Sequence, residues 1–217
     1  MRLDEGIVCV PSAFWEEILK VLILGGFLGS GKTTILVELA KHVIGDDPGD
    51  GAKVVVIENE IGEVGVDDVL LRSGGLQVQN MFAGCVCCTL AGELVPALDK
   101  LQKEYDPELV ILEATGVACP KSIADLIEKC LPEVPVRICT IVDAKRWPRI
   151  KPAIGNLIED QLDNASTVIV NKVDLVTPEQ ADEVAADVAA INSAPHIYKA
   201  SMQDIPGTEV WDDVLGE

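Results

Sequence analysis

The chain has 217 residues, of which 48% are hydrophobic, enough to bury a sizeable core in a single domain. Its 36 acidic and 17 basic residues give a net charge of −19, and such a surface repels nucleic acid and anionic membranes. The longest apolar runs are too short to span a bilayer. We therefore expect neither nucleic acid nor a membrane among the partners.

Strands and helices are predicted to alternate along the chain. Short apolar runs predict strands at 21–25, 53–58, 76–80, 109–114, 136–143, 167–171 and 196–200. Helical patterns fill most of the gaps, at 32–44, 90–105, 120–130, 154–164 and 178–191. Thr177 is the expected cap of the last helix, and Pro178 its first residue.

This alternation predicts an α/β fold: a doubly wound, mostly parallel sheet with helices on both faces. We expect one domain over 1–217. Its parts are an N-terminal extension (1–20), a core (21–200) and an acidic C-terminal segment (201–217).

The first motif is a complete G-x-x-x-x-G-K-[ST] phosphate-binding loop at residues 26–33, directly after a predicted strand. Backbone N–H groups of such a loop, with the positive end of the next helix, cradle phosphate oxygens. Lys32 is expected to reach the β- and γ-phosphates, and Thr33 to bind Mg²⁺. An ordinary glycine-rich turn is the other interpretation. The residues assigned to the cradle are Gly26, Gly29, Ser30, Gly31, Lys32, Thr33 and Thr34.

The second motif places three thiols, Cys85, Cys87 and Cys88, within four residues. The seven cysteines are an odd number and no signal peptide precedes them, which favours a reduced, cytoplasmic protein. Closely spaced thiolates suit Zn²⁺ or another divalent transition metal, with Co²⁺ as a further option. A cluster of small buried residues is the alternative. The other four cysteines are isolated and are expected to be packing residues.

The third motif, Glu113-Ala114-Thr115-Gly116, ends the apolar run 109–112. A carboxylate at the tip of a central strand would hold Mg²⁺ directly or through a water molecule. Gly116 would let the backbone approach the γ-phosphate closely. The alternative is a strand-end Glu113 that simply faces solvent.

The fourth motif, Asn171-Lys172-Val173-Asp174, follows the strand-like run 167–170, at the rim where ligands of parallel sheets bind. Asp174 can accept two hydrogen bonds from guanine, N1–H and the exocyclic amine, and adenine offers neither. Asn171 can bond the other edge of the base, and the Lys172 stem can cover its face. We therefore expect GTP or GDP. In the alternative, Asn171 and Asp174 only cap the next helix.

These motifs together resemble one family, the CobW-like metallochaperone GTPases, relatives of the GTPases that help insert nickel into hydrogenase and urease. The resemblance covers roughly residues 20–200, and unrelated phosphate-loop proteins lack the Cys-x-Cys-Cys element. It rests on five segments in the family's order: Gly25–Thr34, Glu58–Asp67, Gly84–Thr89, Glu113–Gly116 and Asn171–Asp174.

The resemblance implies a transition-metal site coupled to the nucleotide. Carried over by position, Glu60 would join Cys85, Cys87 and Cys88 as a ligand. Family members often carry histidine-rich stretches and a second, C-terminal domain, whereas this chain has two histidines and ends at Glu217. We expect a short form, the GTPase domain only, that does not store metal in bulk.

For mechanism we expect a slow GTPase that acts as a switch. Mg²⁺, Lys32 and the loop amides would neutralise the triphosphate while water attacks the γ-phosphorus. Glu60 and Glu63 are candidates for orienting that water, and no arginine is obviously placed to assist. The expected switches, 59–68 and 114–118, would link nucleotide state to metal affinity.

The expected partners are a client metalloprotein and a second copy of the chain, since GTPases of this family often pair across the nucleotide. Two other classes stay open. One is a regulatory or assembly GTPase whose thiols sense redox state. The other, a P-loop kinase of small molecules, usually needs a basic lid, and the five arginines form no such cluster.

Overall fold

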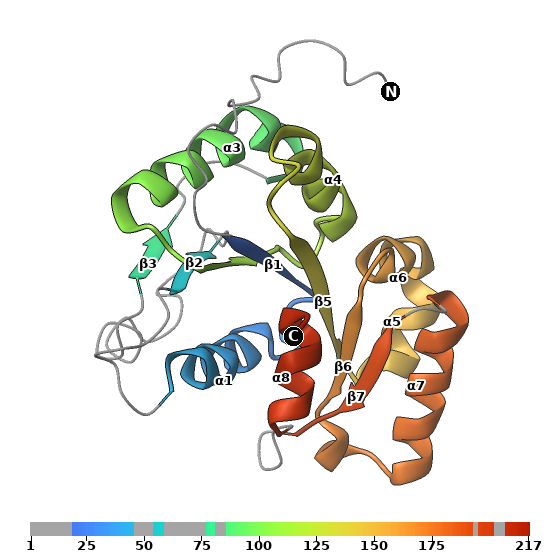
Figure 1. Cartoon of the computed structure of the whole chain (residues 1–217). Coiled ribbons are helices and arrows are strands. Elements are labelled where there is room, and N and C mark those ends of the chain that lie inside the picture. The colour runs from blue at the N-terminus through green and yellow to red at the C-terminus, as the bar shows by residue number, and fades with distance from the viewer. Residues whose placement is uncertain (1–18, 46–53, 59–76, 81–85, 193–194, 202–206) are drawn as a thin grey trace.

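The computed structural model describes residues 19–45, 54–58, 77–80, 86–192, 195–201 and 207–217. At 58, 77–80 and 86–93 it describes the backbone alone. The described residues form one sheet with helices packed on both of its faces (Figure 1). The predicted α/β class is confirmed.

All seven strands pair in parallel, in the order β3-β2-β4-β1-β5-β6-β7. Each lies within one residue of its predicted bounds. The strands are β1 (Lys20–Gly25), β2 (Val54–Glu58), β3 (Gln77–Asn80), β4 (Leu109–Glu113), β5 (Val136–Asp143), β6 (Thr167–Asn171) and β7 (His196–Lys199).

The helices divide between the two faces of the sheet. Figure 1 shows α1 and α8 on one face of the sheet and α3, α4 and α7 on the other. The described helices are α1 (Lys32–Ile44), α3 (Val86–Tyr105), α4 (Pro120–Cys130), α5 (Trp147–Ala153), α6 (Gly155–Leu162), α7 (Pro178–Ile191) and α8 (Thr208–Leu215), with a 3₁₀ turn, η1 (Val173–Leu175).

The core has two layers because the central strands are apolar on both faces. In β1, Val21 and Ile23 pack with α3 and α4, whereas Leu22 and Leu24 pack with α1 and α8. Successive side chains of a strand point to opposite faces, so a strand buried on both sides must be a continuous apolar run. This is why β1 and β4 were recognisable in the sequence.

Three helical segments differ from the prediction. α3 begins at Val86 rather than at residue 90. The predicted helix 154–164 is α6, and the turn Ile154 separates it from α5, which was not predicted. Pro148 is compatible with α5 because it lies in the first turn, where no backbone N–H is needed.

The segment 201–217, predicted as an acidic tail outside the core, contains α8 (Thr208–Leu215). Its Val210, Trp211, Val214 and Leu215 are buried and join the layer that contains α1. Their spacing places them on one face of the helix, with the acidic residues on the other.

No helix in the described part of the chain is both long and apolar enough to cross a membrane.

Candidate nucleotide-binding site

The predicted nucleotide motifs meet at one edge of the sheet. β1 lies between β4 and β5, and all three end at the same edge because they are parallel. Leu24 pairs with Glu113, and Asp143 pairs with Asn171, so the residues at the strand ends are neighbours. Ligands of open parallel sheets bind at this edge.

Three glycines of the loop between β1 and α1 have positive φ angles, a backbone conformation that favours glycine. Gly26, Gly29 and Gly31 have φ angles of 127°, 74° and 103°. A Cβ at position 26 would collide with the Ile141 carbonyl, and one at position 31 with the Asn171 amide. Only glycine accepts both the angle and the close approach, and the loop thereby keeps the path that a phosphate cradle needs.

The Lys32 side chain folds back into this loop. It is 5% exposed, and its Nζ donates to the carbonyls of Gly26 (3.0 Å) and Phe27 (3.4 Å). The buried Ser30 hydroxyl has no hydrogen-bond partner among the described residues. A buried polar group in this condition is costly unless a ligand or water satisfies it. An ammonium group and a spare hydroxyl in one glycine loop fit phosphate oxygens.

The two predicted Mg²⁺ ligands lie side by side. Thr33 Oγ1 donates to Glu113 Oε1 at 3.5 Å, and the same carboxylate oxygen is 4.0 Å from Lys32 Nζ. Glu113 is 8% exposed, so the alternative that it simply faces solvent is wrong. A hydroxyl and a carboxylate are the hard oxygen donors that Mg²⁺ prefers, and the pair therefore fits that ion.

Asn171 connects the fourth motif to the first, the phosphate-binding loop. Its Nδ2 donates to the Ser30 carbonyl at 2.9 Å, and its Oδ1 accepts from the Lys172 backbone N–H at 2.8 Å. Lys172 Nζ contacts the Gly29 carbonyl. Both side chains that were expected on the base thus bind the phosphate loop in this structure.

Asp174 lies in η1 and is exposed, so its carboxylate is accessible to a ligand. The alternative role, capping the next helix, is wrong. Thr177 caps α7 in a capping box: its Oγ1 accepts from the Gln180 N–H, and its own N–H donates to Gln180 Oε1. The predicted cap Thr177 and first residue Pro178 are confirmed.

Sequence reasoning missed Asp143, the last residue of β5. This buried carboxylate accepts from Lys172 Nζ (2.7 Å) and from the Arg146 backbone N–H (3.0 Å). The Arg146 guanidinium in turn donates to the Leu28 carbonyl at 2.6 Å. The available signal was an acid at the end of a predicted strand, the same signal that identified Glu113. A second missed residue, Gln161, contacts the start of the loop.

The predicted transition-metal site falls largely outside the described residues. Of its predicted ligands, Glu60 and Cys85 lie there, as does Glu63, a candidate for orienting water. Cys87 and Cys88 belong to the first turn of α3, where the backbone alone is described. Within the described ranges, no three His, Cys, Asp or Glu side chains are grouped as a metal would require.

Two of the cysteines expected to be packing residues are described as buried. Cys130 and Cys139 both lie in the core, and neither forms a disulfide. Burial raises the pKa of Cys139 to about 12, so this thiol stays protonated and unreactive.

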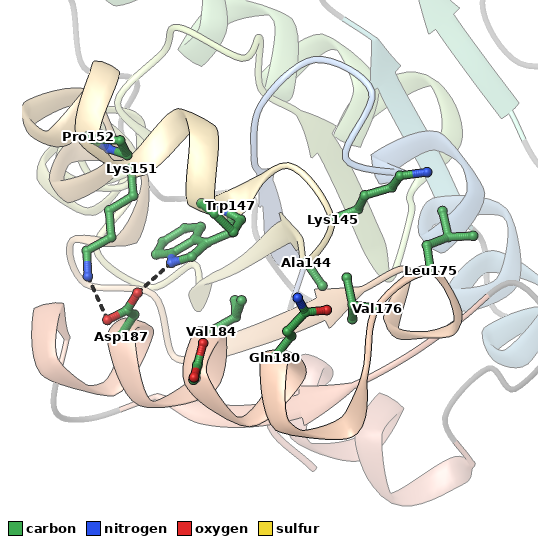
Figure 2. Close-up of a pocket in the computed structure, with 12 residues that line it drawn as sticks. Ala144, Lys145, Trp147, Lys151, Pro152, Leu175, Val176, Gln180, Val184 and Asp187 are labelled. Carbon is green, nitrogen blue, oxygen red and sulfur yellow. Dashed lines mark hydrogen bonds and ion pairs between the residues drawn. The ribbon is translucent and has the colours of Figure 1, made fainter.

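A cavity of about 550 Å³ lies between α5 and α7, next to η1 (Figure 2). The Trp147 indole N–H and Lys151 Nζ both reach Asp187, at 2.9 and 2.6 Å. The hydrogen bond from Lys151, supported by that from Trp147, holds the pKa of Asp187 below its ordinary value. Leu175 and Val176 close the end of the cavity that adjoins the fourth motif. The contacts of Asp187 join α5 to α7 beside this cavity.

The fold and the site define a P-loop nucleotide-binding protein. Residues 20–199 match the CobW/HypB/UreG nucleotide-binding domain, and the chain belongs to this family. The resemblance stated from the sequence motifs is confirmed.

Curated relatives include two zinc chaperones. YeiR of Escherichia coli (strain K12) is 35% identical over 161 residues, which cover 72% of this chain and 47% of YeiR. CobW of Pseudomonas aeruginosa is 29% identical over 225 residues, which cover 87% of this chain and 58% of that protein. The chain thus spans about half the length of the curated relatives that it matches.

Solved structures show the same fold. The Zn(II)-bound YjiA GTPase from E. coli has a TM-score of 0.66 at 24% identity, covering 92% of this chain and 62% of YjiA. The hydrogenase maturation factor HypB from Archaeoglobus fulgidus has a TM-score of 0.65 at 19% identity, covering 91% and 89%.

Proposed function

We propose that the chain is a GTP-binding and GTP-hydrolysing metallochaperone, in which the nucleotide state controls metal binding at the Cys-x-Cys-Cys motif. One observation supports the proposed binding of guanine nucleotides: the hydrogen bond from Asn171 Nδ2 to the Ser30 carbonyl, 2.9 Å long. It joins the guanine-type motif to the phosphate loop across 141 residues. A pocket for guanosine phosphates needs these two pieces next to each other.

The residues at the loop support phosphate binding and slow hydrolysis. Lys32 would exchange its loop carbonyls for phosphate oxygens, and Thr33 and Glu113 would hold Mg²⁺, which neutralises charge on the phosphates. Arg146 lies beside the loop, but its guanidinium is engaged by the Leu28 carbonyl. GTPases in which no arginine stabilises the transition state hydrolyse GTP slowly.

The relatives support the proposed role in metal binding. The curated relatives YeiR, CobW and YjiA are each named a zinc chaperone, and one solved YjiA structure is described as Zn(II)-bound. In this chain Cys85, Cys87, Cys88 and Glu60 would bind Zn²⁺ as cargo, with Co²⁺ as an alternative. Cys87 and Cys88 lie in the first turn of α3, and the N-terminus of a helix favours the thiolate form that binds metal.

We propose two partners for the protein, a client metalloprotein and a second copy of the chain. A client metalloprotein would receive the ion when hydrolysis changes metal affinity. A second copy would pair across the nucleotide. Leu28 and Val117, which are 68% and 67% exposed, offer apolar surface for that contact. The backbone before Val117 is close to Leu28, because a Cβ on Gly116 would lie 2.8 Å from the Leu28 backbone nitrogen.

A Zn²⁺ titration in the apo, GDP and GTP-analogue states tests the proposal. The wild type should bind one ion, with a Kd that differs between the GDP and GTP-analogue forms by about 5- to 150-fold, the usual range of allosteric coupling. Cys87→Ala should lose this site, whereas the control Cys119→Ala, a cysteine at the start of α4, should keep it.

Equal Zn²⁺ affinity in all three states would refute the coupling. Reversible disulfides without bound metal would instead favour the redox-sensing GTPase. Measured binding of GTP and GDP, by calorimetry, tests the nucleotide-binding part of the proposal separately.

A further inference from the structure

The Gln161 side chain connects two loops at the nucleotide edge of the sheet. This residue lies near the end of α6 and is 1% exposed. Its Oε1 accepts from the Gly26 backbone N–H at 2.6 Å, and its Nε2 donates to the Ala118 carbonyl. One buried amide thus joins the start of the phosphate loop to the segment that follows β4.

The neighbours of Gln161 fix its position. Its own backbone carbonyl accepts from Thr140 Oγ1 of β5 at 2.7 Å. A Cβ on Gly25 would lie 2.9 Å from Thr140 Oγ1 and 3.3 Å from Gln161 Oε1. Rotation of the amide would leave a buried donor and a buried acceptor unpaired, which is costly away from water.

The segment held by Gln161 also touches the phosphate loop directly. Ala118 closes a turn by donating its N–H to the Thr115 carbonyl at 3.0 Å. Within this turn, a Cβ on Gly116 would lie 2.8 Å from the Leu28 backbone nitrogen, so the two backbones are in contact. The turn Thr115–Ala118 therefore meets the loop at two places, once through Gly116 and once through Gln161.

The chemistry of the contact requires an amide. One end of the side chain must accept from an N–H, and the other must donate to a carbonyl. A carboxylate cannot donate, and a hydrocarbon can do neither. A merely space-filling residue at this position would have no such requirement.

We propose that Gln161 is a positioning residue that couples the phosphate loop to the Thr115–Ala118 turn, so that the protein distinguishes GTP from GDP partly through this amide. The inference rests on the proposed binding of guanine nucleotides. Gln161 acts through the loop and does not touch the nucleotide. A shift of the turn on γ-phosphate binding moves the Ala118 carbonyl, and the amide passes this shift to Gly26.

The wild-type protein permits a direct test by NMR of glutamine side-chain amides labelled with ¹⁵N. Gln102 of α3 and Gln180 of α7 are internal controls whose bonds stay within their own helical segments. Replacing GDP with a non-hydrolysable GTP analogue should move the Gln161 signal more than either control signal. Equal or smaller movement of the Gln161 signal would overturn the inference.

Variants give a second readout, the ratio of the Kd for GDP to the Kd for the GTP analogue. Gln161→Glu keeps the shape and the acceptor but loses the donor. We expect its ratio to change about five-fold, as for the loss of one buried hydrogen bond. Gln102→Glu and Leu162→Ala, the latter a core control for lost stability, should keep the wild-type ratio.

An unchanged ratio in folded Gln161→Glu would also overturn the inference while leaving the proposed function intact. If the wild type bound neither nucleotide, both the proposed function and this inference would fail.

Discussion

Lys172 Nζ lies 2.7 Å from Asp143 Oδ2, and this ion pair joins the guanine-type motif to the last residue of β5. Lys172 has a φ of 64°, which residues other than glycine rarely adopt. The same ammonium group contacts the Gly29 carbonyl of the phosphate loop. The end of β5, the residue after β6 and the phosphate loop therefore meet at one ammonium group. The guanine-type motif and the phosphate loop are therefore joined in the folded protein.

Asp143→Asn should weaken GTP binding by about three- to ten-fold, because Lys172 loses its anionic partner and is less firmly held on the loop. Calorimetric titration with GTP measures the effect. The control is Asp182→Asn, which removes the exposed partner of Lys199. Equal GTP affinity in Asp143→Asn and the wild type would show that the ion pair does not position the loop.

Lys32→Ala should reduce affinity for GTP by at least about 100-fold, since it removes a charge-assisted contact to the phosphates from a buried site. Lys41→Ala, at an exposed position of the same helix, is the matched control. Binding of a fluorescent GTP analogue measures both. Retained tight binding in Lys32→Ala would mean that the loop is not the phosphate site.

Asp174→Asn should exchange guanine for xanthine specificity. Xanthine has a carbonyl where guanine has its exocyclic amine, and an asparagine amide can donate to it. We expect the ratio of the GTP and XTP affinities to change by at least about 100-fold. Asp160→Asn, on exposed α6 surface, should leave the ratio unaltered. If Asp174→Asn kept wild-type preference, the base would be read elsewhere.

Asp213 should make stability depend on acid pH through its contacts to β7. The Tyr198 hydroxyl, and then His196, hold the pKa of Asp213 below its ordinary value. A lowered folded-state pKa gives stability that is present above the unfolded-state pKa of about 3.9 and is lost as pH falls through the folded value. Asp213→Asn should therefore lower the urea midpoint at pH 7. Between about pH 4 and pH 2, the midpoint of this variant should fall less than that of the wild type.

The control for this prediction is Asp212→Asn on the same helix. The urea midpoint of Asp212→Asn should fall at acid pH by as much as that of the wild type. If Asp213→Asn and the wild type lost stability in parallel below pH 4, the carboxylate would not hold α8 on the sheet.

Local patterns alone were sufficient for most of the fold. β1 and β4 are continuous apolar runs because both faces are buried, and a run of this kind is visible without knowing its neighbours. The glycines of the phosphate loop and the Thr177 cap act within a few residues of chain. α8 escaped prediction because eight residues with one apolar face give little signal until α1 covers that face.

For the candidate site too, some features follow from local sequence and others only from the tertiary structure. The sequence by itself identified the candidate residues for phosphate and base binding, since the spacing of each motif is set by a single loop or turn. Only the tertiary structure decided how those pieces are joined: Thr33 to Glu113 across 80 residues, Gly26 to Gln161 across 135, and Gly29 to Lys172 across 143. Such side-chain bonds depend on which strand ends become neighbours in the sheet, and no local spacing records that order.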